Sequence, residues 1–386
     1  MTSRAADFPV GASVGLAELE TDVHPVLARL RASEPVSWVP AWDCWLVTGH
    51  RDAVEVMRDS ATFTVDDRRF STARVVGASM LSLDGPEHVR HRAPFVAPFR
   101  PARVQQRFGE DVEALARDLV ERFAGTGTAE LRRELAGPLS VAVVADVLGL
   151  AATDADTVLG WYAAIVDAVT TSRADEPVPA AAMRAMASLA EHVHAGLAAG
   201  RPGSLLAGAA GSLDEEQVVA NAAVMMFGGI ETTEGMILNA VRHVLDHGHV
   251  AAAADPERVA ALVEESLRME PAAAVVDRYA TRDVELAEAA IARGDLVRVS
   301  LAGANRDPAV FADPDVFDPD RGNARSQLGF ARGPHVCVAM DLARLETRVA
   351  LHTLVTRLPG LRLAEHSPPR GLVFRKPPTL RVRSDD

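Results

Sequence analysis

A proline-free helical pattern covers residues 212–247 and dominates the sequence. At about 1.5 Å per residue, such a helix would be about 52 Å long, which is enough to cross a domain. Ser212 and Glu215 form a capping-box pattern at its start, and Gly248 is a suitable stop at its end. Its centre, VVANAAVMMFGG, is apolar on all sides, so we expect the helix to run through the core.

Polar residues interrupt this apolar helix near its middle. Gly228 and Gly229 are followed by Glu231, Thr232 and Thr233. Paired glycines weaken a helix, and a buried carboxylate carries a desolvation cost. Two interpretations are open: a functional site, where such local rules are often broken, or a close helix crossing at the glycines beside a satisfied polar cluster.

The rest of the chain predicts a mainly α fold with a small β portion. Helical patterns dominate from about residue 52 to 255, and Asp255 with Pro256 suits the start of a further helix. No repeat or low-complexity linker divides the sequence, so we expect one catalytic domain over residues 1–386. Segments rich in β-branched and aromatic residues predict β-rich portions at about 35–49, 284–300 and 372–382. Within them we expect a pair of strands around a turn at 36–49 and short strands at 284–286, 296–300, 372–374 and 380–382.

Composition excludes several classes of function. The formal net charge is −13, with mixed signs along the chain, and this argues against nucleic acid and against anionic membrane surfaces. The longest nearly apolar run, Val218 to Ile230, is too short to span a bilayer, and the N-terminus lacks a signal-peptide profile. We therefore expect a cytoplasmic protein, and we also expect it to be a monomer.

One of the two cysteines lies in a loop with the sequence FARGPHVCVAM, residues 330–340. A helical pattern follows Cys337 until Pro359, so the thiol lies near a helix N-terminus, which favours a thiolate. Zinc is excluded because the chain offers no matching set of partners. A catalytic thiol stays open, whereas a thiolate ligand to heme iron needs only one cysteine. Cys44, between Trp42 and Trp45, is interpreted as a packed thiol.

The ordered set of motifs resembles the cytochrome P450 superfamily, in its soluble bacterial form. The cysteine loop is similar to the family's heme loop, and the polar break in the long helix is similar to its acid–alcohol motif. A Glu-x-x-Arg motif and an FDPDR segment follow in the expected order. The matching residues are Phe330, Gly333, His335 and Cys337 in the loop, Gly228, Gly229, Glu231, Thr232 and Thr233 in the helix, and Glu265, Arg268, Arg321, His88, Arg92 and Arg278 elsewhere. Ala339 stands at a loop position where the family most often has glycine.

The resemblance implies a P450 fold with the long helix over a heme b group and Cys337 as the axial thiolate ligand. It implies that His88, Arg92, Arg278 and His335 hold the propionates, with Gly228, Phe330, Gly333 and Ala339 also lining the heme site. Glu231 and Thr232 would deliver protons to bound dioxygen, the co-substrate, and Glu265, Arg268 and Arg321 would form a buried structural network. The implied substrate pocket is hydrophobic. It includes Val75, Val76, Met80, Leu81, Met226, Phe227, Val275 and Val276, together with the stretch 165–179.

Three hypotheses for function follow from the resemblance. The first is a monooxygenase that receives electrons from a separate ferredoxin and ferredoxin reductase and oxidises a hydrophobic small molecule in specialised metabolism. The second is a peroxygenase that uses peroxide, and the third is a heme-thiolate sensor without turnover. Arg332, Arg344 and Arg348 would form a basic docking patch for ferredoxin, unless they pair locally.

Two departures from the family pattern concern local backbone geometry. Ala331 stands where the family loop has glycine, so this turn must avoid positive φ or accept strain. Pro94 and Pro98 follow Arg92 closely, so we expect the helix that contains Arg92 to be short or kinked.

Overall fold

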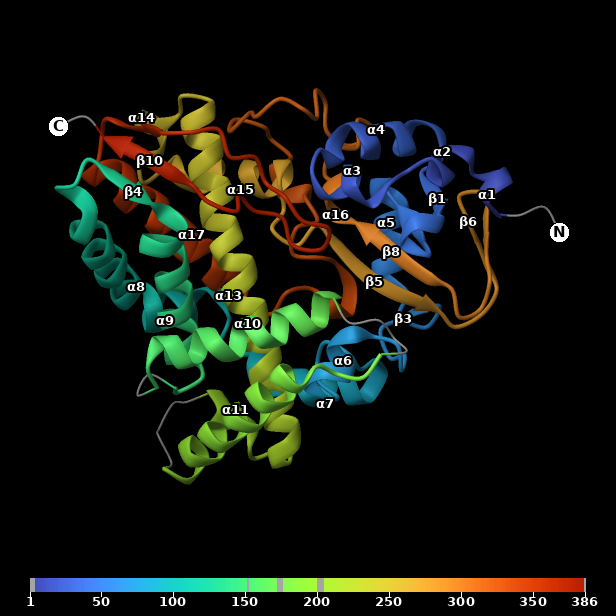
Figure 1. The fold of residues 1–386 in the computed structure, drawn as a ribbon, viewed down its shortest axis with the longest axis horizontal. Helices are drawn as coiled ribbons and strands as arrows, with labels where there is room; N and C mark the ends of the chain where they lie inside the picture. Colours follow the sequence, from blue (N-terminus) through green and yellow to red (C-terminus); the bar gives the residue numbers. More distant parts are fainter. Residues whose placement is uncertain (1–3, 151–152, 172–175, 200–204, 385–386) are drawn as a thin grey trace.

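The computed structural model describes residues 4–150, 153–171, 176–199 and 205–384. The fold is mainly helical with a small sheet portion, as the sequence predicts (Figure 1). No helix in these ranges is both long and apolar enough to cross a membrane. The helices are α1 Arg4–Asp7, α2 Pro9–Ala12, α3 Leu16–Glu20, α4 Val23–Ser33, α5 His50–Arg58, α6 Ser71–Val76, α7 Gly85–Val96, α8 Pro101–Ala124, α9 Gly137–Val147, α10 Ala155–Thr171, α11 Ala180–Ala198, α12 Leu205–Ala209, α13 Glu215–Asp246, α14 Val250–Ala253, α15 Val259–Met269, α16 Leu301–Ala304 and α17 Met340–Arg357.

The strands form a five-stranded sheet of order β1-β2-β8-β5-β3 and two smaller sheets. The hairpin predicted near residues 36–49 is confirmed, and the segments at 284–286 and 296–300 are strands. The prediction of a strand at 372–374 is wrong, because Phe374 makes only an isolated bridge to Ala273. The strands are β1 Val36–Val39, β2 Cys44–Val47, β3 Phe63–Thr64, β4 Thr128–Glu130, β5 Val275–Ala280, β6 Val284–Leu286, β7 Ala289–Ile291, β8 Leu296–Ser300, β9 Leu361–Leu363 and β10 Arg381–Ser384.

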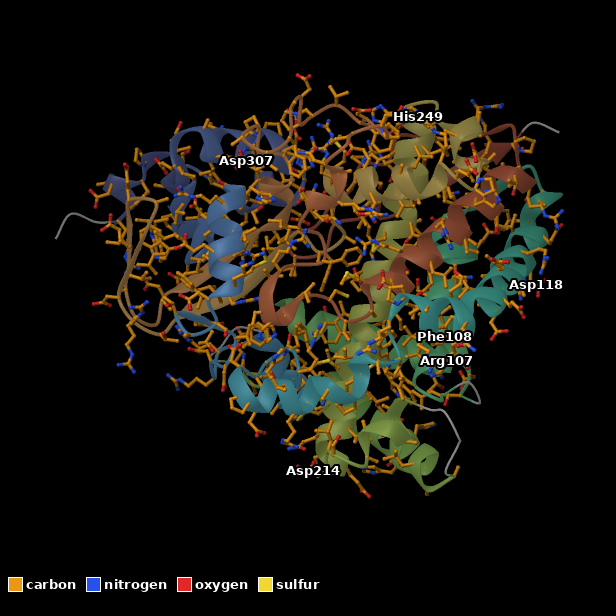
Figure 2. All side chains as sticks on the ribbon, turned by 180° about the vertical axis from the view of Figure 1, so that it is seen from behind. Arg107, Phe108, Asp118, Asp214, His249 and Asp307 are labelled. Atoms are coloured by element: carbon orange, nitrogen blue, oxygen red, sulfur yellow. The ribbon has the colours of Figure 1, made fainter. Side chains whose placement is uncertain are left out.

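Helix α13 crosses the whole molecule. Figure 2 labels Asp214, just before its first residue, and His249, just after its end, at opposite edges of the protein. The predicted capping box of Ser212 and Glu215 is wrong, since Asp214 accepts a hydrogen bond from the backbone N–H of Gln217 at 2.9 Å instead. The side chain of Gln217 accepts the N–H of Asp214 in return. A carboxylate therefore caps this helix, two residues later than the sequence pattern indicates.

The core is packed around α13, which contacts α9, α11, α15 and α17. A Cβ atom added to Gly229 would lie 2.7 Å from the Val144 side chain of α9, so this glycine permits a close helix crossing. A Cβ atom on Gly228 would meet nothing within 4 Å. The paired glycines therefore differ: Gly229 serves packing, and Gly228 borders open space.

Two helices differ in detail from the sequence patterns. Helix α15 begins at Val259 rather than at Asp255, because residues 255–258 form turns. Helix α7 keeps Pro94 inside it and ends at Val96 after 12 residues, so it is short, as expected. Asp84 precedes its first residue in an extended conformation.

Candidate functional site

The cysteine loop lies immediately before α17. The backbone N–H of Cys337 donates to the carbonyl of Phe330 at 2.9 Å and closes the loop. Ala331 has φ of +58° and Gly333 has φ of +75°. The turn at Ala331 therefore accepts the strain of a left-handed alanine. Gly333 also packs against the backbone of Met57 and Arg58, where a larger residue would collide.

The surroundings of Cys337 have opposing effects on its thiol. Burial raises the pKa of Cys337, while the backbone N–H of Ala339 and the guanidinium groups of Arg92 and Arg344 lower it. Arg92 also donates to the carbonyl of Val336 at 2.6 Å, which ties α7 to the loop. The neighbours that favour a thiolate are thus in place around this sulfur. Cys44, in contrast, is fully buried, and burial raises its pKa to about 12, as suits a packed thiol.

Four basic side chains from three parts of the chain gather beside the loop; we call them the cationic cluster. They are His88 and Arg92 of α7, Arg278 of β5, and His335. The rings of His88 and His335 lie 4.3 Å apart. Burial is the main cause that lowers the pKa of His88 to about 4 and that of Arg278 to about 10.

Asp84 is the acidic residue that orients this cluster. His335 Nε2 lies 2.8 Å from Asp84 Oδ1, and Asp84 Oδ2 accepts hydrogen bonds from the Thr64 hydroxyl and the Val65 N–H. Although burial opposes ionisation, these hydrogen bonds lower the pKa of Asp84 to about 2. Sequence reasoning missed Asp84, although its place three residues before Glu87 at a helix start marks it as a capping position.

The cationic cluster fits the two carboxylates of a heme group. Among the described residues, His88 Nε2 and His335 Nδ1 are buried nitrogens without a hydrogen-bond partner. Arg278 is 4% exposed, and the hydrogen bond that it makes goes to the carbonyl of Asp277 rather than to a carboxylate. Buried cations and unsatisfied nitrogens are costly, and anionic oxygens would satisfy both.

A second buried charged group, which we call the Glu265 cluster, ties α15 to the segment 305–321. Glu265 and Arg268 are both 0% exposed and form a two-pronged ion pair at 2.7 and 2.8 Å. Arg321 adds a contact to Glu265 at 3.1 Å. Arg268 also donates to three carbonyls, of Asn305, Pro314 and Val316. Both guanidinium groups of this cluster are therefore paired with a carboxylate.

One face of α13 is less buried than the rest of the helix. Met225, Gly228, Gly229 and Thr232 are half-buried, whereas nearly all their neighbours on the helix are buried. The spacing of three and four residues places them on one stripe. The Thr232 hydroxyl donates to the Gly228 carbonyl at 2.5 Å. Met225 belongs to this open stripe, and sequence reasoning missed it.

Glu231, next to this stripe, is held by two partners that are distant in sequence. The Tyr162 hydroxyl of α10 donates to Glu231 Oε2, and Lys376 Nζ lies 2.7 Å from Glu231 Oε1. Lys376 Nζ also lies 2.7 Å from Glu234 Oε1. Neither Tyr162 nor Lys376 carries a sequence signal for this role, because the contacts depend on tertiary folding.

The predicted substrate residues fall into three groups. Val75, Val76, Met80, Met226 and Phe227 share one hydrophobic cluster, and Leu81 packs against it. Val275 and Val276 belong to two other clusters, because consecutive strand residues point to opposite faces. The structure therefore does not join them to the first group. Within the stretch 165–179, residues 172–175 lie outside the described residues.

The arginines predicted to form a docking patch have local contacts. Arg332 donates to the carbonyls of Gln327 and Arg325, and Arg344 pairs with Glu264 at 2.5 Å. Arg348 makes a long contact of 3.5 Å to Gln105.

Comparison with known proteins identifies the family. Residues 204–359 match the cytochrome P450 family. The chain is 34% identical to nocardicin C N-oxygenase of Nocardia uniformis subsp. tsuyamanensis, over 97% of this chain and 96% of that protein. It is 33% identical to erythromycin C-12 hydroxylase of Saccharopolyspora erythraea, over 89% of this chain and 88% of that protein. A solved structure of a post-tailoring hydroxylase involved in himastatin biosynthesis matches with a TM-score of 0.82 and 30% identity, over 100% of both chains.

The fold and these relatives define a class of heme-thiolate oxygenases. The chain belongs to the cytochrome P450 family and is a cytochrome P450 monooxygenase. The resemblance inferred from the sequence motifs is thereby confirmed. Membership implies a heme bound through a thiolate.

Proposed function

We propose that this monooxygenase binds heme b through Cys337 and uses dioxygen, with electrons from separate proteins, to oxidise a hydrophobic small molecule. The observation that carries the proposal is the cationic cluster beside the Cys337 loop. It gathers four basic side chains, two of which have buried nitrogens with no partner among the described residues. An anionic cofactor at this place removes that cost.

When bound, a thiolate-ligated heme supplies the electron-transfer and dioxygen chemistry of the reaction. Cys337 would hold the heme iron through its thiolate, and the N–H of Ala339 would hydrogen-bond to its sulfur. His88, Arg92, Arg278 and His335 would hold the propionates. The open space at Gly228 leaves room for a small ligand against the backbone of α13.

Glu231 and Thr232 would supply protons on the open face of α13. A carboxyl group can carry a proton, and a hydroxyl can accept one hydrogen bond while donating another. Thr232 donates to the Gly228 carbonyl, so its hydroxyl oxygen keeps the capacity to accept. Activation of dioxygen consumes protons, and an acid next to an alcohol can deliver them. Hydrogen peroxide already carries these protons, so a reaction driven by peroxide does not need the pair.

The substrate would be an apolar or amphipathic small molecule of specialised metabolism. Six of the predicted pocket residues belong to or pack against the main hydrophobic cluster and are all apolar, and Met225 adds a flexible side chain on the open stripe. Two similar proteins are named as an oxygenase of nocardicin C and a hydroxylase of erythromycin.

The electron donors would be a ferredoxin and a ferredoxin reductase. Arg58 and Arg344 lie close enough to Arg332 to lower its pKa, so positive charge gathers on the face of the cysteine loop. The chain as a whole carries −13, and such a contrast steers an acidic partner to one face. Since Arg332 binds loop carbonyls, the exposed Arg58 is the better residue for charge reversal.

The test is turnover of a substrate found by its shift of the ferric heme spectrum. We expect product with NAD(P)H, reductase, ferredoxin and oxygen, and none with hydrogen peroxide alone. Arg58→Glu should raise the apparent KM for ferredoxin at low salt without changing substrate affinity, and high salt should have the same effect. Turnover with peroxide alone would favour the peroxygenase hypothesis, and absence of turnover with either would favour the sensor.

Thr232→Ala tests the proton pathway, with Thr233→Ala as the matched control. Thr232→Ala should keep heme content and substrate binding while it diverts reducing equivalents to peroxide. Product formed per NAD(P)H consumed is the measurement. If Thr233→Ala lowers this ratio and Thr232→Ala does not, the two threonines exchange roles.

A further inference from the structure

Lys376 is the single lysine of the sequence, although the chain contains 40 lysine and arginine residues. Everywhere else the positive side chains are arginine. Lysine and arginine differ physically: an ammonium is compact and can lose its proton, whereas a guanidinium is a broad planar fork that stays protonated. The position of the one lysine therefore marks the place where a cationic side chain of this protein can release a proton.

That place is beside the proposed proton donor Glu231. Lys376 Nζ lies 2.7 Å from Glu231 Oε1 and 2.7 Å from Glu234 Oε1, so one nitrogen bridges two carboxylates a turn apart on α13. The three side chains are 11%, 9% and 6% exposed, respectively. Ion pairs this far from water are screened little.

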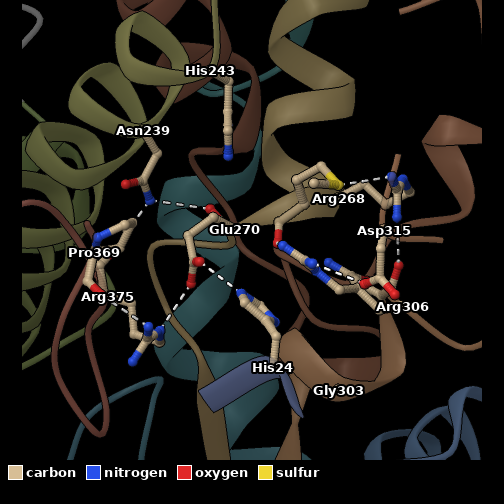
Figure 3. A network of polar contacts seen from close by, with 12 residues as sticks. His24, Asn239, His243, Arg268, Glu270, Gly303, Arg306, Asp315, Pro369 and Arg375 are labelled. Atoms are coloured by element: carbon tan, nitrogen blue, oxygen red, sulfur yellow. Dashed lines mark hydrogen bonds and ion pairs between the residues drawn. The ribbon is translucent and has the colours of Figure 1, made fainter. Parts of the chain in front are cut away.

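The loop that carries Lys376 is fixed firmly to α13. A Cβ atom on Gly235 would lie at contact distance from the loop, 3.5 Å from Lys376 Cβ, but only 2.9 Å from Ala272 Cβ, so the glycine permits the close approach of Ala272 to the helix. Asn239, one turn further on, donates to the carbonyls of Arg375 and Glu270, as Figure 3 shows. The neighbouring Arg375 binds Glu270 at 2.8 Å. Glu231, Glu234, Gly235 and Asn239 thus form one stripe of α13 that faces this loop.

The cluster runs from the buried Glu231 to the protein surface. Arg132 pairs with Glu234 at 2.7 Å, and its side chain is 39% exposed. At the other end, Tyr162 donates to Glu231. Burial raises the pKa of Tyr162, and the Glu231 carboxylate raises it further, so the phenol stays neutral and acts as a donor. Between surface and Glu231, the group that can both hold and release a proton next to Glu231 is Lys376.

We propose that Lys376 supplies protons to Glu231 during oxygen activation. The proton leaves the ammonium of Lys376 and joins Glu231 Oε1, which yields a neutral amine and a carboxylic acid. Glu231 then passes this proton on toward Thr232 and returns to the carboxylate. The amine takes up one hydronium proton from solvent at the Arg132–Glu234 edge and becomes an ammonium again, so the net result is one proton moved from solvent toward Thr232. The 2.7 Å separation of Lys376 Nζ and Glu231 Oε1 lets the transfer between them occur along one direct contact. This inference rests on the proposed function of Glu231.

Exchange of the lysine for arginine is the decisive variant, because it keeps the charge and removes the exchangeable proton. We expect Lys376→Arg to lower product formed per NAD(P)H at least tenfold, since a positioned proton donor contributes about 10²–10⁴-fold. The solvent deuterium isotope effect should change as well. Heme content and substrate affinity should stay as in the unchanged protein. Wild-type coupling and isotope effect in Lys376→Arg would overturn the proposal while leaving the monooxygenase assignment intact.

The matched control is Arg357→Lys, the reverse exchange in an exposed pair. Arg357 lies 2.8 Å from Glu121, and both side chains are about half exposed. We expect no change in its coupling, that is, in the product formed per NAD(P)H consumed. Glu234→Gln is the second variant, which keeps Glu231 and Lys376 but removes the link to the surface. It should lower coupling in the same direction as Lys376→Arg, and unchanged coupling would contradict the route from the surface.

A second readout does not depend on turnover. Lysine labelled with ¹³C at the ε carbon should give one signal from the folded holoenzyme, that of Lys376. Glu231→Gln should shift this signal, because it replaces a charged partner at 2.7 Å. Arg357→Lys adds one exposed reference signal, which Glu231→Gln should leave in place. A Lys376 signal that does not respond to Glu231→Gln would show that the pair does not form in solution and would overturn the proposal.

Discussion

The cationic cluster and the Glu265 cluster are both buried and rich in arginine, but they balance their charges differently. In the Glu265 cluster, Arg268 meets a carboxylate and three carbonyls, and Arg321 meets the same carboxylate. In the cationic cluster, Asp84 is the acidic neighbour, and it is already bonded to His335, Thr64 and Val65.

This difference separates stability from cofactor binding. A cluster whose guanidinium groups are paired with a carboxylate contributes to the fold whether or not a ligand is present. A cluster whose buried guanidinium groups lack such an ion pair is costly until an anion arrives, and the anion then binds tightly. Arginines of the two clusters should therefore give opposite results when they are removed.

The largest effect is expected at Cys337, in the loop beside the cationic cluster. Cys337→His should abolish the carbon monoxide difference band typical of thiolate-ligated heme, because the ligand atom changes from sulfur to nitrogen. The cationic cluster stays intact in this variant, so heme should still be bound. Spectra of the reduced protein with carbon monoxide measure the effect. A variant that kept the band would refute Cys337 as the ligand.

Removal of the Arg268 guanidinium should cause the next largest change. Arg268→Met leaves Glu265 buried without its two-pronged partner, and breaking such a pair costs about 3–5 kcal/mol of unfolding free energy. Urea unfolding of the heme-free protein is the measurement. Arg258→Met, in an exposed pair with Asp320, is the control and should cost less than about 1 kcal/mol. A loss as small as the control's would show that the Glu265 cluster is not structural.

Removal of Arg278 should show the opposite pattern. Arg278→Met should leave the heme-free protein as stable as before or more stable, because it removes a buried cation that forms no ion pair with a carboxylate among the described residues. Heme should bind about tenfold to a hundredfold more weakly, since a hydrogen bond to a charged group contributes about 1.5–3 kcal/mol. Transfer of heme to an excess of a scavenging protein measures this affinity. Destabilisation without weaker heme binding would remove the distinction between the clusters.

The smallest expected effect is on how the free energy of unfolding of the heme-free protein depends on pH. Burial, with His335 and Arg92, lowers the pKa of His88 to about 4 from an ordinary value of 6.5. Between pH 6.5 and about 4 the unfolded chain binds a proton that the folded chain refuses, so the free energy of unfolding falls as the pH falls. His88→Gln should weaken this slope in heme-free protein. If the slope of unfolding free energy against pH did not change, another histidine would be the source of this pH dependence.

Local patterns predicted much of the fold and part of the site. The apolar run of α13, the hairpin at 36–49 and the helix after Cys337 are visible because they depend on neighbouring residues. The cap at Asp214 and the start of α15 were missed by a few residues, since several polar side chains in each turn can cap a helix. Tyr162, Lys376 and Asp84 contact residues 69, 145 and 251 positions away, respectively, and no periodic pattern encodes such distances.

The contacts of Arg375 have a consequence for the order in which this chain can fold. Its guanidinium donates to the carbonyls of Leu19, Glu20 and Thr21, and the contact with Leu19 spans 356 residues. During synthesis, these carbonyls at the end of α3 have no such donor until nearly the whole chain has left the ribosome. Closing so long a loop is entropically costly, and it is a late event in folding. The first helices to be made are therefore among the last to be locked in place.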